Sequence, residues 1–167
     1  MTKPAKGPAA SDEEDALPRT PRNVVYALFV AAQRSRELMA VALRDAPIRA
    51  DEYGVYSAVY AAGSLTQSEL ARSTGMPLTT VADYVRAMVD RGHLRRYPHP
   101  ADRRSVLLEL TRSGIETVHV IMPAFTHAVR SLTDELDMPA DQVTAALEAL
   151  AGATARVTRR LEAEAPA

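Results

Sequence analysis

The chain contains no cysteine, and it has no apolar run long enough to cross a membrane. Without cysteine, disulfides, thiolate metal ligands and a thiol-based redox switch are all excluded. A membrane-spanning helix needs about 20 mostly apolar residues, and the amino end lacks the basic and apolar composition of a secretory leader. We therefore expect a cytoplasmic protein. At 167 residues, the chain has the length of one ordinary domain.

Signs of catalysis and of metal binding are also scarce. The four histidines stand without the His-Glu-x-x-His pattern or the clustered carboxylates of a zinc enzyme. His119 and His127 are eight residues apart, or about 12 Å along a helix, which is too far for one ion without other ligands. No glycine-rich phosphate loop and no nucleophile elbow is present. We expect neither an enzyme nor a bound cofactor or metal, with a zinc-responsive regulator as the alternative.

Charge is unevenly distributed along the chain, although the formal net charge is only −1. Residues 72–112 carry eight arginines and four acidic residues, a balance of +4. Residues 113–167 carry four arginines and eight acidic residues, a balance of −4. This asymmetry would direct a polyanion to residues 72–112. A solvated mixture of surface charges is the alternative interpretation.

The first part of the chain divides into a tail and a long helix. Residues 1–20 combine prolines, alanines and an acidic run without a periodic apolar face, which indicates a disordered tail. The remainder, residues 21–167, is expected to form one domain. Between residues 22 and 44, apolar side chains recur at steps of three and four and predict a helix that ends before Pro47. Its length exceeds what a small motif needs, so we expect a second role in subunit assembly.

Two shorter helices are marked by their ends. Asp51 is a candidate cap for a helix that runs to about Ala61 and stops at Gly63. The run Thr-Gln-Ser-Glu that begins at Thr66 has the form of a capping box. In such a box Thr66 accepts a hydrogen bond from a first-turn amide, and Glu69 reaches back to the amide of Thr66. The start of this second helix is therefore well specified.

A third helix follows after a turn at Gly75, which can take the left-handed conformation. Pro77 suits its first turn, and the helix extends to about Arg91. One face is apolar and is predicted to lie in the core: Leu78, Val81, Val85 and Met88. The opposite face carries side chains that can bond to base edges or phosphates: Thr79, Thr80, Asp83 and Arg86. An ordinary amphipathic surface helix would show the same pattern, so the choice between the two interpretations depends on the next segment.

That segment is a short basic hairpin. Residues 94–97 predict a strand, residues 98–101 a turn that resists further pairing, and residues 105–110 the returning strand. We predict that Asp102 pairs with Arg104 and directs its guanidinium toward a minor groove, while Arg103 contacts phosphate. Helix, turn, helix and hairpin together predict a winged helix-turn-helix, whose second helix enters the major groove of DNA.

From Thr66 to Gly114 the chain resembles the winged-helix core of the multiple antibiotic resistance regulator (MarR) family of bacterial transcription factors. Five segments carry the resemblance: residues 66–71 (TQSELA), 79–81 (TTV), 90–92 (DRG), 102–105 (DRRS) and 110–114 (LTRSG). The similar arrangement extends over about residues 22–162. It implies a mainly α fold with a small β-hairpin wing. It places the winged helix-turn-helix at about residues 48–112 and dimerisation helices at about residues 21–46 and 113–163.

The resemblance implies a homodimer that binds a pseudo-palindromic operator in double-stranded DNA. It assigns groove contacts to Thr79, Thr80 and Asp83 and a wing contact to Arg104, supported by Asp102. The full predicted set of DNA-binding residues is Thr66, Gln67, Ser68, Thr79, Thr80, Asp83, Arg86, Asp102, Arg103 and Arg104. Two departures stand out, because Asp83 is an acid where such helices often carry a polar or basic residue, and His93 replaces a usual leucine. An acid there repels phosphate, unless it reads a cytosine amino group.

Two more helices are expected after Gly114. The first continues to Leu136 with a bend at Pro123, and the second runs from Pro139 to about Glu162. The apolar stripe of the last helix has no partner in the winged region, so we expect a second subunit to cover it. Many members of the family release DNA when a small aromatic or phenolic molecule binds between the dimerisation and DNA-binding regions. Candidate effector contacts, for which plain core packing is the alternative, are Tyr26, Phe29, Tyr53, Tyr56, Met122 and Phe125.

The sequence thus predicts a sequence-specific DNA-binding transcriptional regulator, a repressor that a small-molecule effector releases. The alternative is a winged-helix module that uses the same surface to bind another protein and has no operator. Such a module should expose apolar residues where this chain carries basic and polar ones.

Overall fold

The computed structural model describes residues 23–165, so the tail predicted for residues 1–20 lies outside the described residues. The described part divides within its first helix into two compact units, residues 23–35 and residues 36–165. The elements are α1 (Val24–Ala42), α2 (Ala50–Ala62), β1 (Ser64–Thr66), α3 (Gln67–Thr74), α4 (Leu78–Asp90), β2 (Leu94–His99), β3 (Asp102–Leu110), α5 (Arg112–Asp134) and α6 (Ala140–Glu164). This order confirms the predicted mainly α fold with a small hairpin wing.

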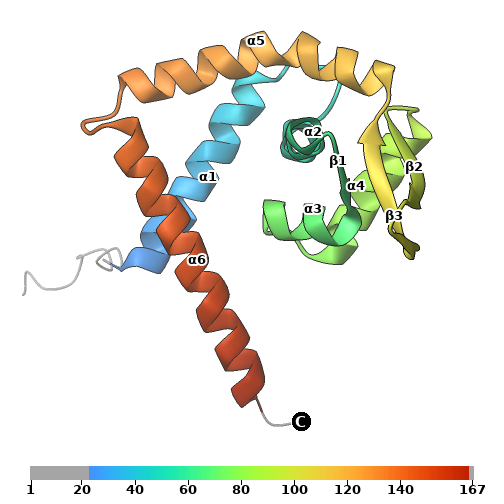
Figure 1. Ribbon diagram of the computed structural model, residues 1–167. Coiled ribbons are helices and arrows are strands. Elements are labelled where there is room, and N and C mark those ends of the chain that lie inside the picture. Colours follow the sequence, from blue (N-terminus) through green and yellow to red (C-terminus); the bar gives the residue numbers. More distant parts are fainter. Residues whose placement is uncertain (1–22, 166–167) are drawn as a thin grey trace, which may run out of the picture. The chain divides into compact units, whose positions relative to one another are not determined.

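The core of residues 36–165 is built around α2, which lies between α5 and the pair of α3 and α4 (Figure 1). Val55, Tyr56 and Val59 of α2 have no exposed side-chain surface, as their helical spacing predicts. They join one cluster with fully buried residues from α3, α4, β3 and α5, including Leu70, Val81, Val85, Met88, Leu108, Val118 and Ile121. Because this cluster includes residues from every element of the winged region, α2 supports α3, α4 and the hairpin from inside.

The start of α2 differs from the prediction. The residue that flanks its first turn is Arg49, and Asp51 already lies inside the helix. The side chain that reaches back is Glu52, whose Oε2 accepts a hydrogen bond from the Arg49 amide at 3.0 Å. Glu52 stands three residues after Arg49, which is the spacing of the returning acid in a capping box. The prediction failed because it placed the cap at the first acid of the segment.

The turns around α3 follow the sequence closely. Gly63 and Gly75 both have positive φ, 71° and 68°, and end α2 and α3 as predicted. Thr66 accepts a hydrogen bond from the Glu69 amide at 3.2 Å, and Glu69 accepts one from the Thr66 amide at 2.7 Å. These two bonds confirm the capping box. The hydrogen bonds that the Glu69 carboxylate accepts from the Thr66 amide and hydroxyl lower its pKa. Local side-chain chemistry therefore fixes where α3 begins and ends.

The sheet contains a strand that was not predicted. Its three antiparallel strands have the order β1-β3-β2. Strand β1 has only three residues, which is too short to show an alternating pattern. Its central residue, Leu65, pairs with Leu108, and both side chains are buried. Since Thr66 ends β1 and caps α3, this strand ties the start of α3 to the base of the hairpin.

The two long carboxyl-terminal helices expose much of their apolar surface. Helix α5 continues through Pro123, and helix α6 has no buried side chain. On α6, Leu147, Val157 and Leu161 are exposed by 49%, 42% and 57%. In Figure 1, α6 follows the end of α5 after a short loop and projects from it as a separate long helix. None of the helices in residues 23–165 is both long and apolar enough to span a bilayer.

Candidate nucleic-acid interface

Helix α4 presents the polar face that the sequence predicted. Thr79, Asp83 and Arg86 are exposed and Thr80 is half-buried, whereas Val81, Val85 and Met88 on the opposite side are fully buried. Leu78 was predicted to lie in the core, and this was wrong, because it is 52% exposed. It is the first residue of the helix, where the chain has only just entered from Pro77 and the core stripe begins one turn later. A polar face with one apolar residue at its start is thus available to a ligand.

Asp83, the acid that stood out in the sequence, is paired on the same helix. Its Oδ1 accepts a hydrogen bond from Nη1 of Arg86 at 3.2 Å, and both side chains are about 70% exposed. The arginine offsets the repulsion that a lone carboxylate would exert on phosphate. Exposed pairs of this kind contribute little to stability and exchange partners easily. Both groups therefore stay available to DNA.

The α3 side of the interface is the capping box. Thr66 and Gln67 are half-buried, and Ser68 is exposed on the first turn of α3. Backbone amides at a helix amino terminus carry a partial positive charge that favours phosphate. The Thr66 hydroxyl donates to Glu69 Oε2 at 2.9 Å, so this threonine is already engaged within the protein. Ser68 is the freest of the three for a backbone contact.

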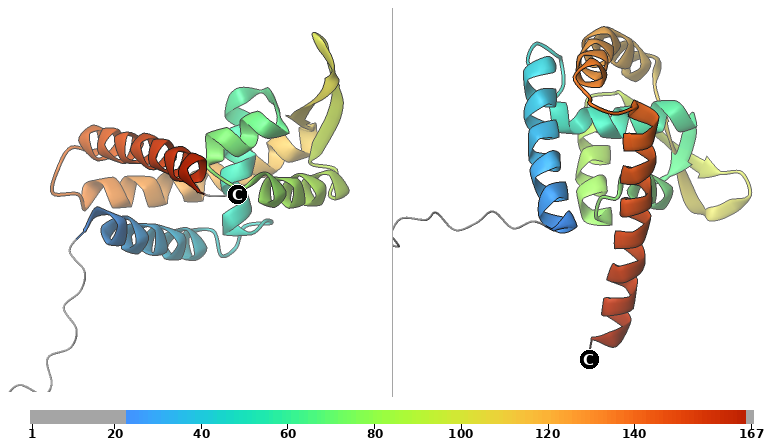
Figure 2. Two further views of the ribbon diagram at one scale, coloured as in Figure 1. Left: turned by 90° about the horizontal axis from the view of Figure 1, so that it is seen from below. Right: turned by 90° about the vertical axis from the view of Figure 1, so that its left-hand side faces the viewer.

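The hairpin of β2 and β3 forms a longer wing than predicted. Residues 98–101 were expected to resist pairing, but Pro98 pairs with Val106 and His99 with Asp102, so only two residues connect the strands. Proline is tolerated because β2 is an edge strand, where its missing amide breaks no ladder bond on the open side. The register shifts between Pro98 and His99. In both views of Figure 2 the hairpin projects beyond the neighbouring helices.

The tip of the wing is organised differently from the prediction. Asp102 was expected to pair with the guanidinium of Arg104, but its Oδ1 accepts a hydrogen bond from the backbone amide of Arg104 at 3.0 Å. An aspartate that bonds the amide two residues on closes a small turn, which is a shorter reach than a guanidinium pair requires. Asp102 therefore shapes the backbone, and the Arg104 side chain is exposed. The side chain of Arg103 lies outside the described part of the chain.

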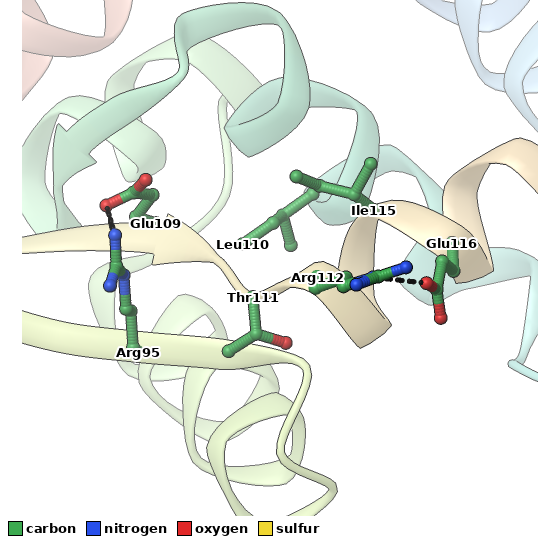
Figure 3. A pocket seen from close by; sticks show the side chains of 7 residues that line it. All are labelled: Arg95, Glu109, Leu110, Thr111, Arg112, Ile115 and Glu116. Carbon is green, nitrogen blue, oxygen red and sulfur yellow. Dashed lines mark hydrogen bonds and ion pairs between the residues drawn. The ribbon is translucent and has the colours of Figure 1, made fainter.

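Much of the positive charge counted in residues 72–112 is neutralised inside the protein. Four of the eight arginines form ion pairs: Arg86 with Asp83, Arg91 with Glu52, Arg95 with Glu109, and Arg112 with Glu116. Figure 3 shows the last two pairs lining a shallow groove at the base of the wing. Within the described side chains, Arg72, Arg96 and Arg104 form no ion pair. The basic potential is therefore concentrated on α3 and the wing.

A part-buried polar cluster around Glu52 joins α2 to the end of α4, and the sequence analysis did not predict it. Glu52 is only 4% exposed and accepts hydrogen bonds from both Nη atoms of Arg91, with the Arg91 Nη1 distance at 3.1 Å. Arg91 Nη1 also donates to the Tyr56 hydroxyl at 3.3 Å, which lies 2.8 Å from His93 Nδ1. Burial alone would raise the pKa of Glu52, but its hydrogen bonds from Arg91 and the Arg49 amide lower the pKa overall. Glu52 and Arg91 are 39 positions apart in the sequence, so their spacing does not indicate that they interact.

His93 gives this cluster a predicted pH dependence. Burial has the largest effect on the pKa of His93 and lowers it below 6.5. The positive charge of Arg91 lowers this pKa further, and the negative charge of Glu52 raises it in part. A histidine with a depressed folded-state pKa contributes stability above pH 6.5, and that stability is lost as the pH falls toward the folded pKa. We expect the wild-type melting temperature to fall more steeply below pH 6.5 than that of His93→Gln, measured by circular dichroism. His127→Gln, on exposed surface, should follow the wild-type curve, and identical curves for all three proteins would contradict the prediction.

Of the six candidate effector residues, four lie in the unit of residues 36–165 and two in the unit of residues 23–35. Tyr53 is buried against Phe125, with ring centroids 4.8 Å apart, and Tyr56 belongs to the polar cluster. Tyr26 and Phe29 contact each other, at 6.3 Å between centroids, in the unit of residues 23–35. Met122 lines an open groove of about 520 Å³ along α5, together with His119, Pro123, Thr126, His127 and Arg130. In residues 23–165, no three His, Asp or Glu side chains come together as a metal site would require.

Comparison with known proteins points to one family. A MarR family profile matches residues 49–105, which run from the start of α2 into the wing. The chain is 27% identical over 111 residues to the HTH-type transcriptional repressor NicR of Pseudomonas putida, covering 64% of this chain and 70% of NicR. A mutant MarR from E. coli in complex with operator DNA superposes with a TM-score of 0.65 and 25% identity, over 78% of this chain and 92% of that protein. Together these comparisons support a MarR-family winged-helix regulator that binds DNA.

A second solved structure extends the match over most of the chain. BpsR of Bordetella bronchiseptica gives a TM-score of 0.63 and 24% identity, covering 93% of this chain and 98% of BpsR. At this identity the likeness shows the fold. The residues that match the MarR-family profile include α4 and the tip of the wing, which are the elements of the candidate interface described above.

Proposed function

We propose that this MarR-family regulator binds a pseudo-palindromic operator as a homodimer, acts as a repressor in the cytoplasm, and is released by a small aromatic or phenolic effector. The observation that supports DNA reading most strongly is the polar face of α4 beside a projecting wing. The wing tip carries Arg104, which forms no ion pair with another described side chain. A helix of this size fits the major groove, and an arginine on a narrow hairpin fits the adjacent minor groove.

Each contact in this proposal has a distinct role. The hydroxyls of Thr79 and Thr80 read base edges, and the Asp83 and Arg86 pair opens to accept from cytosine or to donate to guanine or phosphate. The first turn of α3, at Ser68, holds a phosphate and sets the register of the protein on the duplex. Arg104 reads minor-groove width, where negative potential is greatest in narrow segments.

Replacing Thr80 with valine is expected to reduce sequence discrimination while sparing electrostatic binding. Valine keeps the shape and removes the hydroxyl, so the variant should lose about fivefold to tenfold in affinity for the operator and little for unrelated DNA. The measurement is fluorescence anisotropy across a salt series, in which wild-type affinity must fall steeply as salt releases counterions. Thr126→Val on α5 is the matched control. Equal losses on both duplexes would contradict the assignment of Thr80 to base reading.

The homodimer rests on apolar surface that the single chain leaves uncovered. The stripe of Leu147, Val157 and Leu161 on α6 is joined by exposed Val129 and Leu132 on α5. A 25-residue helix without a buried side chain is accounted for if a second copy covers this stripe. Two-fold pairing would place two α4 helices about 34 Å apart, one turn of DNA. Sedimentation of the protein with a single-operator duplex should give two chains per duplex, and one chain per duplex would refute the dimer.

The effector proposal is supported by the groove along α5. Met122 provides a soft apolar floor, and Arg130, His119 and His127 line the same groove. Such a combination suits an aromatic ring that bears an acidic or phenolic group. In the structurally similar BpsR of Bordetella bronchiseptica, DNA binding is regulated by 6-hydroxynicotinic acid.

Calorimetric titration tests the effector directly. Phenolic and nicotinic acids are expected to bind wild type with micromolar to millimolar affinity, and Arg130→Gln should weaken the binding about tenfold by removing the cation. Arg112→Gln, which removes an exposed arginine at the other end of α5, is the control. Silence with every acid tested would remove the effector from the account.

The protein-binding alternative is not favoured by the exposed surface. The predicted contact positions on α4 and the wing are polar or charged, with Leu78 as the one exposed large apolar side chain of α4. A protein-docking face would need a contiguous apolar patch at these positions.

A further inference from the structure

The first turn of α2 holds α4 at two points. The Tyr84 hydroxyl of α4 donates to Asp51 Oδ2 at 3.0 Å. The Arg91 guanidinium, at the end of α4, donates to the neighbouring carboxylate of Glu52. Consecutive residues of one helix thus bond to side chains seven positions apart on the other. None of these four residues belongs to the face assigned to DNA.

The two bonds lie on one edge of α4. At about 100° per residue, positions 84 and 91 are about 20° apart around the helix axis, and two turns apart along it. On one side of this edge lies fully buried Met88, and on the other lies Thr80. Two bonds separated along one edge restrain both the rotation and the tilt of α4, which a single bond could not do.

The anchoring carboxylates are themselves held in place. Asp51 accepts two hydrogen bonds from the Arg49 guanidinium, with Nε to Oδ1 at 3.0 Å and Nη2 to Oδ2 at 2.5 Å. Glu52 accepts from the Arg49 amide and is almost fully buried. Tyr53, the next residue, packs its ring on Phe125 of α5. This turn is therefore fixed to α5 on one side and to α4 on the other.

We propose that Asp51 and Glu52 are positioning residues for operator discrimination, which set the orientation of α4 through Tyr84 and Arg91. The inference rests on the proposed reading of DNA by α4. Base-edge contacts demand accurate placement, whereas phosphate contacts tolerate small shifts of a flexible side chain. Loosening either bond therefore reduces specific affinity and leaves non-specific affinity unchanged. The pairing also means that Arg91, although basic, supplies no phosphate contact.

The test compares a specific and a non-specific duplex. The specific probe is the duplex that the wild-type protein enriches from a randomised pool, and the other is a scrambled duplex of equal length. The variants are Glu52→Gln, which removes the charge that holds Arg91, and Tyr84→Phe, which removes one hydroxyl and keeps the ring. Asp45→Asn is the matched control, because it removes a carboxylate charge from a side chain that is 93% exposed. Each protein is assayed by anisotropy over a salt series, at a temperature where circular dichroism shows it folded.

Both variants are expected to lower the ratio of specific to non-specific affinity about tenfold, comparable to the cost of one mismatched base pair. Their salt slopes on the scrambled duplex should equal that of wild type, and Asp45→Asn should change neither quantity. If Glu52→Gln is too unstable to assay, Tyr84→Phe alone decides the matter. An unchanged ratio, or equal losses on both duplexes with a lower salt slope, would overturn the proposal while leaving operator binding intact. Failure of wild type to enrich any duplex would instead overturn operator binding itself, and this inference with it.

Discussion

Replacing Gly114 with alanine is expected to destabilise the protein by about 3 kcal/mol, at the upper end of the usual cost of overpacking. A Cβ atom at this position would lie 2.2 Å from the carbonyl oxygen of His93, 3.1 Å from its carbonyl carbon, and 3.2 Å from Leu110 Cδ2. Two of these atoms are backbone, so no side-chain rotation can relieve the clash. Gly114 is thus required where the first turn of α5 crosses the turn after α4.

The contacts around Gly114 leave little room for that turn to move. The His93 carbonyl accepts a hydrogen bond from the Thr111 amide at 3.0 Å, and the Thr111 hydroxyl donates to the Gly92 carbonyl at 2.6 Å. The same hydroxyl oxygen accepts from the Gly114 amide at 3.2 Å. Shifting the backbone to admit a methyl group would break several of these bonds. The damage would reach α4, because the His93 amide donates to the Met88 carbonyl.

Urea denaturation followed by circular dichroism measures this cost. Gly152→Ala on α6 is the matched control, because the nearest group to its added Cβ is the flexible end of Arg156 at 3.3 Å. There the substitution should be neutral or should stabilise the helix by up to about 1 kcal/mol. A Gly114→Ala protein as stable as wild type would show that α5 does not cross the turn as closely as described.

Replacing Arg104 with alanine should weaken operator binding by about a hundredfold, the largest effect expected of any single wing residue. Each subunit of the proposed dimer inserts one wing, so one substitution removes two arginines from the complex, at roughly tenfold for each. The substitution breaks no ion pair with another described side chain, and the hydrogen bond from the residue 104 backbone amide to Asp102 remains. The folded protein should therefore keep its melting temperature.

The salt dependence separates a groove contact from a general loss of charge. Arg104→Ala should lower the slope of log affinity against log salt by about one for each wing. Arg112→Ala is the control, since it removes an arginine that is 93% exposed and paired with Glu116 at the start of α5. Affinity changes that are equal in the two variants would mean that overall charge, and not the position of Arg104, governs binding.

The sequence predicted the features of this molecule that depend on neighbouring residues. The capping box at Thr66 and the left-handed Gly75 each arise within one turn, and the buried stripe of α4 repeats from one turn to the next, so local spacing decides the outcome. The fold class followed from the order of these elements. Leu78 was misassigned because a stripe read by spacing does not show where the helix begins.

Features that depend on distant partners could not be predicted in this way. Strand β1 is three residues long and exists because Leu65 pairs with Leu108. The ion pair of buried Glu52 with Arg91 joins two residues whose spacing in the sequence follows no helix or strand period. His93 takes part through its hydrogen bond to Tyr56. The prediction for the wing tip was wrong for a local reason. The Asp102 carboxylate bonds to the backbone amide of Arg104, which is nearer to it than the guanidinium of Arg104.

Hydroxyl-radical footprinting tests most directly whether α4 and the wing contact duplex DNA together. The probe is the duplex that the wild-type protein enriches from a randomised pool. We expect two symmetric protected segments about one helical turn apart, with additional protection in the flanking minor grooves. In Arg104→Ala the flanking protection should disappear while the central segments persist at saturating protein. A footprint that Arg104→Ala leaves unchanged, or no protection at concentrations that saturate binding, would contradict the account.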